Sequence, residues 1–242
     1  SLSNSDFARF HQKIRAIHFY GAGLTHDNVK NVLIRSFKEI FPSATEISVN
    51  SDLLAAGRAL FGNDPGIACI LGTGSNSGIY KNNEIADKIP ALGYILGDEG
   101  SGARMGTDFL NALFKRQFPA ALEKEILENE NITMEDSLEK VYKKDFPNMY
   151  LASITQILIK YIHHEPVREI IKNSLEAYFQ KNIEKYKDYK SYELGFAGSI
   201  AFYFREILEE LISEKGMKCR KIIKAPIDEL TKYHIKNTNE FR

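Results

Sequence analysis

Four short stretches of this 242-residue sequence carry hydroxyl, amide or carboxylate side chains that could bind a ligand. Three of them contain glycines, and three lie at the predicted ends of strands. The most informative, residues 70–78, reads Ile-Leu-Gly-Thr-Gly-Ser-Asn-Ser-Gly and ends an apolar run. Gly72 and Gly74 let the backbone approach an anion closely, and the hydroxyls of Thr73 and Ser75 can donate to phosphate oxygens. The stretch therefore predicts a phosphate-binding turn, with an ordinary β-hairpin turn as the alternative.

The residues that follow this turn exclude two common nucleotide-binding loops. The turn is not a Walker A loop, because no Gly-Lys-Ser/Thr follows it. It is not a dinucleotide-binding fingerprint either, because Gly78-Ile79-Tyr80 resembles a strand and not the start of a helix.

Carboxylates stand in two of the other stretches. Asp98 and Glu99 lie among the glycines of residues 93–102, directly ahead of a predicted helix, where the helix dipole stabilises negative charge. Asp52 follows a predicted strand, at the end of Asn50-Ser51-Asp52. Each carboxylate can serve a ligand, and the alternative for each is to cap the helix that follows.

The fourth stretch is Ala197-Gly198-Ser199, where a predicted strand passes into a helix. The helix N-terminus can face a nucleotide, or Ser199 can simply be its N-cap. Ligands of open α/β sheets bind outside the carboxyl ends of the strands. Because the stretches cover several such ends, we predict that they form one ligand site.

The elements that must position these residues alternate between strands and helices, except in one long helical segment. Strands are predicted at 16–20, 45–49, 66–71, 192–197 and 219–223, and two more flank 81–84. Helices are predicted at 29–40 (capped by Thr25 or Asp27), 52–61, 103–116, 119–128, 133–144, 148–163, 165–185, 200–213 and 227–234. The order predicts a discontinuous α/β domain that carries an α-helical insertion.

Composition excludes several classes of protein. The 32 basic residues balance 32 acidic ones, which lacks the positive excess of a nucleic-acid binder. No apolar run approaches the roughly 20 residues that cross a bilayer, and Ser1-Leu2-Ser3-Asn4 does not begin a signal peptide. Cys69 and Cys219, the only cysteines, suggest neither a disulfide framework nor a metal site. We therefore expect a cytoplasmic protein that binds a small molecule, without nucleic-acid or membrane partners.

In their order and combination, the four stretches resemble the N-acetylglucosamine kinase branch of the BadF/BadG/BcrA/BcrD ATPase family. The resemblance extends from about residue 16 to residue 234. It implies an actin-like (ribonuclease H-like) ATPase fold. Residues 1–98 would then hold the remainder of the N-terminal lobe and the start of the C-terminal lobe, 99–190 a mainly helical insertion, and 191–242 the return to the C-terminal lobe.

The same resemblance implies the transfer of a phosphoryl group from ATP to a sugar hydroxyl. Asp52 matches the general base of the family. The positions that match ATP-binding residues are Gly72, Thr73, Gly74, Ala197, Gly198 and Ser199. The positions that match sugar-binding residues are Ser75, Asn76 and Asp98. Mg²⁺ would arrive with the ATP phosphates and not in a protein cage, so no metal-ligating residue is predicted.

Two departures from the family pattern affect these expectations. The family begins with a hairpin that carries an Asp-x-Gly-x-Thr motif, which this sequence lacks, so we expect the 242-residue chain to be a poor kinase by itself. Leu92 stands where the family often has Trp, which affects the sugar preference. Two alternatives stay open: an ATPase that activates a partner enzyme, and a sugar-binding module without turnover. Aromatic helices also leave a homodimer open.

Overall fold

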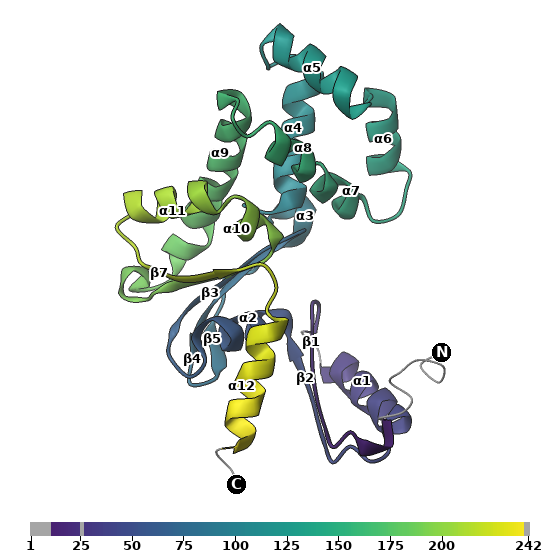
Figure 1. The fold of residues 1–242 in the computed structure, drawn as a ribbon, viewed down its shortest axis with the longest axis vertical. Coiled ribbons are helices and arrows are strands. Elements are labelled where there is room, and N and C mark those ends of the chain that lie inside the picture. The colour runs from purple at the N-terminus through teal and green to yellow at the C-terminus, as the bar shows by residue number, and fades with distance from the viewer. Residues whose placement is uncertain (1–10, 25–26, 240–242) are drawn as a thin grey trace. The chain divides into compact units, whose positions relative to one another are not determined.

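The computed structural model describes residues 11–24 and 27–239 (Figure 1). The predicted cap Thr25 and the residues Ser1 to Asn4 lie outside these ranges. The chain divides into two compact units, with the boundary between Ala55 and Ala56. In the described part of the chain, no helix is long and apolar enough to cross a membrane.

The first unit is built from two parallel strands joined by a helix. Strand β1 (Ala16–Gly21) leads through α1 (Asp27–Ile40) to β2 (Glu46–Ser51). The strands pair in register from Ala16 opposite Glu46 to Gly21 opposite Ser51. Helix α2 (Asp52–Phe61) begins directly after β2, so Asp52 stands at the carboxyl end of a strand, as predicted.

The second unit is organised around a five-stranded mixed sheet in the order β5-β4-β3-β6-β7. Its strands are β3 (Gly66–Leu71), β4 (Ser75–Lys81), β5 (Glu84–Asp87), β6 (Leu194–Ala197) and β7 (Cys219–Ile223). The first three pair antiparallel, and β3, β6 and β7 run parallel. The apolar run at 66–71 is therefore the central strand, and Ile67, Ala68, Cys69 and Leu71 are all fully buried.

The predicted hairpin at 81–84 is confirmed. Asn82 and Asn83 have φ values of 53° and 63°, the left-handed conformation that asparagine tolerates better than most residues. They connect β4 to β5, which is one of the two edge strands of the described sheet.

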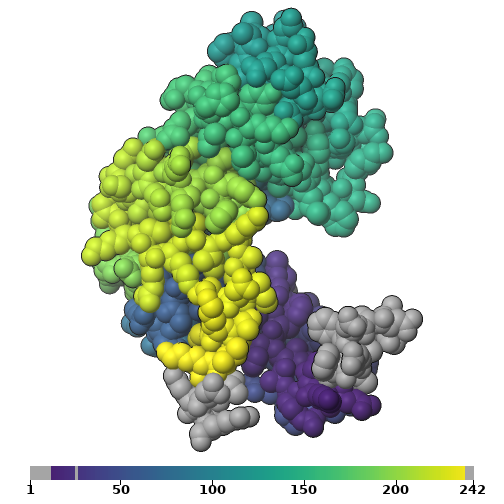
Figure 2. All heavy atoms as spheres, in the orientation of Figure 1, coloured from purple at the N-terminus to yellow at the C-terminus, as the bar shows by residue number. Residues whose placement is uncertain are grey.

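Helices fill the interval between β5 and β6 and follow the last two strands. They are α3 (Gly93–Leu96), α4 (Gly102–Phe114), α5 (Ala120–Glu130), α6 (Met134–Tyr142), α7 (Pro147–Ser153), α8 (Thr155–Lys160), α9 (Glu165–Lys181), α10 (Ser199–Tyr203), α11 (Arg205–Glu214) and α12 (Ile227–Asn239). Figure 1 shows α4 to α8 gathered beyond one end of the five-stranded sheet. In the space-filling view of Figure 2, the atoms of this helical segment, coloured teal to green, are packed together.

The structure corrects three of the predicted helices. The helix expected at 148–163 is interrupted at Ile154, where the hydroxyls of Ser153 and Thr155 donate to the carbonyls of Tyr150 and Ala152. Such side-chain bonds compete with the helical ladder. The helix expected at 200–213 is likewise divided, at Phe204. The helix expected at 165–185 ends at Lys181, and a short 3₁₀ turn follows it.

The core of the second unit lies between the sheet and the helices α4, α9 and α11. Phe109, Tyr178, Phe179, Phe196 and Phe204 are among its fully buried aromatic side chains. Close packing of α4 against α7 depends on a missing side chain in α4, because a Cβ on Gly106 would lie 2.7 Å from the carbonyl carbon of Leu151. This packing anchors the start of α4, which borders the candidate site.

Candidate active site

The turn between β3 and β4 is bonded to the first turn of α4. Gly72 donates its N–H to the carbonyl of Gly74 at 2.9 Å, which closes the turn. The carbonyls of Gly72 and Thr73 accept from the amides of Gly102 and Ala103 at 2.8 and 3.1 Å. The side chain of Thr73 is exposed, so its hydroxyl can reach a ligand outside the sheet. The turn is therefore a fixed support for an exposed hydroxyl donor.

Asp98 lies directly on this turn. Its Oδ1 accepts the backbone N–H of Ser75 at 3.3 Å, and a Cβ on Gly74 would lie 2.9 Å from its Oδ2. The absence of a side chain at Gly74 thus gives the carboxylate its place. Burial raises the pKa of Asp98, the Ser75 amide lowers it, and the charge of Glu99 raises it again, with a net increase. A buried carboxylate with a second oxygen beside a turn suits a ligand hydroxyl.

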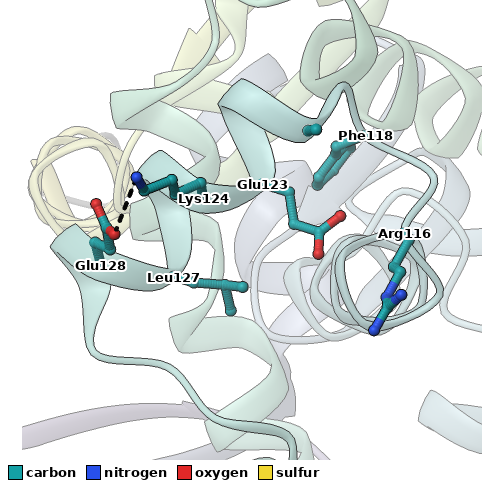
Figure 3. Close-up of a pocket in the computed structure, with 7 residues that line it drawn as sticks. Arg116, Phe118, Glu123, Lys124, Leu127 and Glu128 are labelled. Carbon is teal, nitrogen blue, oxygen red and sulfur yellow. Dashed lines mark ion pairs between the residues drawn. The ribbon is translucent and has the colours of Figure 1, made fainter.

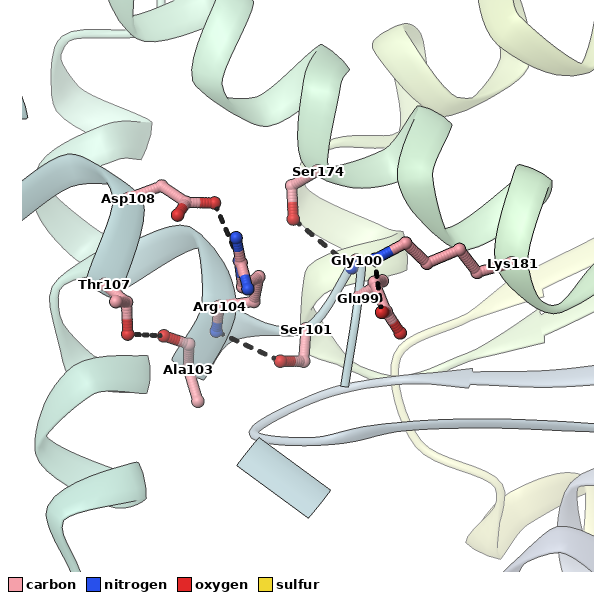
Figure 4. Close-up of polar contacts among 9 residues, drawn as sticks. All are labelled: Glu99, Gly100, Ser101, Ala103, Arg104, Thr107, Asp108, Ser174 and Lys181. Carbon is pink, nitrogen blue, oxygen red and sulfur yellow. Dashed lines mark hydrogen bonds and ion pairs between the residues drawn. The ribbon is translucent and has the colours of Figure 1, made fainter. Parts of the chain in front are cut away.

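Asp98 and Glu99 are not the caps of α4. Ser101, which is fully buried, accepts the amide of Arg104 at its Oγ at 3.2 Å and so caps the helix (Figure 4). The carboxylate of Glu99 instead lies 3.0 Å from Nζ of Lys181. Burial raises the pKa of Glu99, but the hydrogen bond and charge of Lys181, with further donors, lower it by more. The capping interpretation of this acid pair is therefore wrong.

The third turn, after β6, packs against the end of β3. Gly198 has a φ of 128°, and a Cβ there would lie 2.6 Å from the carbonyl carbon of Leu71 and closer still to its oxygen. The Gly198 amide donates to the carbonyl of Ile223 at 3.0 Å. Gly198 is also the N-cap residue of α10, so Ser199 is the first helical residue and not the cap. Only glycine fits this contact.

Asn76 and Ser75 begin β4 beside these turns. Ser75 is buried, whereas Asn76 is half-buried and its Oδ1 accepts the amide of Ser77 at 3.0 Å. The Asn76 carbonyl accepts from the hydroxyl of Tyr178 at 2.9 Å. Sequence reasoning did not assign Tyr178 to the site, because only the fold brings α9 to β4.

Asp52 belongs to the first unit. It is the first residue of α2, where its Oδ1 accepts the amide of Leu53 at 2.8 Å. The acceptor for the amide of Leu54 is the Oγ of Ser51, at 3.2 Å. The side chain that caps α2 through the amide three residues further on is therefore Ser51, and not Asp52. The dipole of α2 favours the ionised carboxylate at this position.

The structure thus brings together the nine predicted site residues of the second unit at the ends of β3 and β6. The contact between Gly198 and Leu71 joins two of the turns, and the bonds from Gly102 to Gly72 and from Ser75 to Asp98 join the third. Exposed hydroxyls lie beside a buried carboxylate and an amide. This set can donate to phosphate and pair with a polyol.

A separate cavity of about 550 Å³ opens beside α5 (Figure 3). It is lined by Arg116, Phe118, Ala120, Glu123, Lys124, Leu127 and Glu128. None of the predicted site residues lines it. In the described part of the chain, no three His, Cys, Asp or Glu side chains are grouped to hold a metal ion.

No protein-family model and no curated protein matches this chain. Among solved structures, it matches the crystal structure of the "Putative N-acetylglucosamine Kinase" from Porphyromonas gingivalis with a TM-score of 0.92 and 37% sequence identity. The match covers 96% of this chain and 81% of that chain. This chain belongs to the same family as that protein. The family likeness confirms the expected α/β, actin-like fold, with a central sheet and flanking helices.

A second crystal structure is similar to this chain in fold alone. It is the "Putative N-acetylglucosamine Kinase" from Chromobacterium violaceum, with a TM-score of 0.67 and 18% identity. The match covers 88% of this chain and 73% of that chain.

Proposed function

We propose that this protein transfers the γ-phosphoryl group of ATP to a hydroxyl of an amino sugar, with N-acetylglucosamine or a close relative as the substrate. The observation that carries the proposal is the junction of three glycine turns at the ends of β3 and β6. Asp98 lies against the central one of these turns, which connects β3 to β4. The family membership supports the same reaction class, since the P. gingivalis protein carries the description "Putative N-acetylglucosamine Kinase".

The proposed nucleotide contacts follow from the exposure and backbone of two turns. Thr73, with Gly72 and Gly74, would hold ATP phosphates, because its hydroxyl is exposed on a turn that α4 holds in place. Ala197, Gly198 and Ser199 would lie beside the adenosine.

The proposed sugar contacts come from Ser75, Asn76 and Asp98. An amide and a carboxylate together donate and accept, as a ring of hydroxyls requires. Asp98 already holds the backbone of Ser75, so a sugar that bonds its second oxygen would also tighten the turn.

Asp52 is proposed as the general base. The sugar hydroxyl oxygen forms a bond to the γ-phosphorus while the bond from that phosphorus to the bridging oxygen breaks, and ADP leaves. The hydroxyl proton passes to the Asp52 carboxylate. The position of Asp52 at the start of α2, directly after β2, supports this role, since it places a carboxylate at the carboxyl end of a strand.

Mg²⁺ fits this proposal as an ion carried by the nucleotide. The described residues offer no group of three ligands, and Asp98 is already bonded to Ser75. When bound, the ion would neutralise charge on the phosphates.

The test is a panel of amino sugars incubated with ATP, Mg²⁺ and the complete gene product, with the sugar phosphate identified by mass spectrometry. The proposal predicts stoichiometric ADP and sugar phosphate with an N-acetylated hexosamine. ATP hydrolysis without any sugar phosphate would favour an activating ATPase, and sugar binding without ADP would favour a binding module.

A further observation favours the kinase over an activating ATPase that carries an iron–sulfur cluster. Such a cluster is held by thiolates. Cys69 is fully buried in β3, and burial raises its pKa to about 12. A kinase purified without oxygen should be colourless, whereas absorbance that is lost on Cys219→Ser would contradict the kinase.

A further inference from the structure

One face of α9 contacts both segments that carry the proposed sugar-binding residues, the start of β4 and the loop before α4. The Ser174 Oγ accepts the amide of Gly100 at 3.2 Å, and the Tyr178 hydroxyl donates to the carbonyl of Asn76 at 2.9 Å. Lys181 pairs with Glu99 at 3.0 Å (Figure 4). Spacings of four and three residues place these side chains on successive turns of one helical face.

Two of these contacts are shielded from water. Tyr178 is fully buried and Ser174 is 4% exposed. Water therefore cannot replace the Tyr178 hydroxyl if it is removed, and the Asn76 carbonyl would lose this donor. Burial also raises the pKa of Tyr178 well above its ordinary value, so the hydroxyl keeps its proton and remains a donor.

The loop of Gly100 lies directly on the same helix. Gly100 has a φ of 74°, and a Cβ there would lie 2.8 Å from the Cβ of Tyr178. Asp98 is two residues before this contact and bonds the amide of Ser75. The hydroxyl of Tyr178 thus contacts the start of β4, and its Cβ lies against the loop of Gly100.

We infer that Tyr178 and Ser174 are positioning residues, which hold Asn76 and Asp98 at a fixed separation so that both can bind one sugar. The inference rests on the proposed function. It assigns to α9 a part in substrate affinity, although no residue of α9 belongs to the proposed binding set. The contacts lead to Asn76 and to the loop of Asp98, which are proposed to bind the sugar, and not to Thr73, which is proposed to bind ATP. Their loss should therefore weaken sugar binding more than ATP binding.

Tyr178→Phe tests the inference, with Tyr80→Phe as its matched control. Tyr80 is also fully buried, lies on the same strand that Tyr178 contacts, and donates its hydroxyl to the carbonyl of Gly62 at 2.6 Å. Both substitutions remove one buried hydroxyl, but only Tyr178 contacts Asn76. We expect Tyr178→Phe to raise KM for the sugar about 3- to 10-fold, the range typical of one lost hydrogen bond. KM for ATP should stay within about twofold.

Tyr80→Phe should lower Tm but leave both KM values unchanged. Ser174→Ala should raise KM for the sugar in the same direction as Tyr178→Phe. The inference is overturned if Tyr178→Phe changes neither KM, or if it changes both equally, or if the control shows the same pattern.

Hydrogen exchange without ligand separates this inference from the proposed function. Tyr178→Phe should hasten exchange at the amides of Ser75 and Gly100, and Tyr80→Phe should not. A wild type that phosphorylates no sugar would overturn the function, while faster exchange would still uphold the positioning of the two loops. A wild type that phosphorylates the sugar, with exchange unchanged in Tyr178→Phe, would overturn the positioning alone.

Discussion

Replacing Gly198 by alanine should destabilise the protein more than any ordinary glycine substitution and should also impair ATP use. The residue has a φ of 128°, and its missing Cβ would lie 2.6 Å from the carbonyl carbon of Leu71 and 3.3 Å from the amide nitrogen of Gly72. These are backbone atoms at the end of the central strand, so neither can rotate aside as a side chain could.

The magnitude follows from three effects. A side chain in this backbone region costs about 1–3 kcal/mol. Overlap with packed atoms costs about 1–3 kcal/mol more. Alanine also lowers the conformational entropy of the unfolded chain, which offsets about 0.4–1 kcal/mol of this cost. We therefore expect the free energy of unfolding to fall by about 3 kcal/mol, which lowers Tm by about 6–12 °C for a chain of this length.

Gly216→Ala is the matched control. Gly216 also has a positive φ, 65°, but a Cβ there meets nothing within 4 Å. Only the left-handed conformation is penalised, so the free energy of unfolding should fall by about 1 kcal/mol and Tm by about 2–4 °C. Urea unfolding of both variants gives the two free energies, and steady-state kinetics give KM for each substrate.

In Gly198→Ala, a shifted turn at Leu71 and Gly72 should raise KM for ATP or lower kcat, while sugar affinity by calorimetry changes less. In Gly216→Ala, both should be unchanged. Equal destabilisation of the two variants would refute the close approach of the β6 turn to β3. Strong destabilisation of Gly198→Ala with normal ATP kinetics would refute the assignment of this turn to the nucleotide.

Three further predictions concern the carboxylates and the central turn. Asp52→Asn should lower kcat by about 10²- to 10⁴-fold with little change in sugar affinity. Its control Ser51→Ala, which removes the capping acceptor of α2, should lower Tm but retain kcat. Near-normal turnover of Asp52→Asn would exclude Asp52 as the general base. Calorimetry on Asn76→Ala should show a loss of sugar affinity of about 1–3 kcal/mol, and Thr73→Val should weaken ATP binding instead; equal losses for both ligands in both variants would indicate a collapsed loop. Because the folded-state pKa of Asp98 is raised, its contribution to the stability of the wild type should fall as the pH rises through that pKa. The Tm of Asp98→Asn relative to the wild type should therefore increase from pH 4 to pH 7. A constant difference in Tm would contradict the raised pKa.

The sequence predicted strongly patterned elements well. The strand at 66–71 is found at its predicted bounds, because six consecutive small or apolar residues fit a strand that is buried on both faces. The helix at 52–61 is also found as predicted, since Ser51 supplies a capping acceptor and apolar residues recur along it. In contrast, α3 at Gly93–Leu96 was missed, because its exposed Ile95 and Leu96 give no amphipathic pattern in so short a helix.

The contacts that assemble the site could be predicted from the sequence less well than the site residues themselves. Gly72 and Gly198 stand out in the sequence because they lie in glycine-rich turns. The close approach of Gly198 to the backbone of Leu71, however, depends on the parallel pairing of β3 with β6. The bond from Tyr178 to Asn76 joins residues 102 positions apart, and buried tyrosines at helical spacing look like ordinary core. Local patterns predict elements, whereas a partner across the fold is fixed only by packing.

The place of β3 in the sheet has a consequence for how the chain folds during synthesis. On one side β3 pairs with β4, which follows within four residues, but on the other side it pairs with β6, which begins 123 residues after Leu71. At about 5–20 residues per second, a ribosome takes roughly 6–25 s to produce that interval. Until then the central strand, which is apolar along its whole length, keeps an open edge that can pair with another nascent chain. Slowing translation within the helical segment would lengthen this exposure, and early folding of α4 to α9 would bring the arriving β6 to its edge sooner.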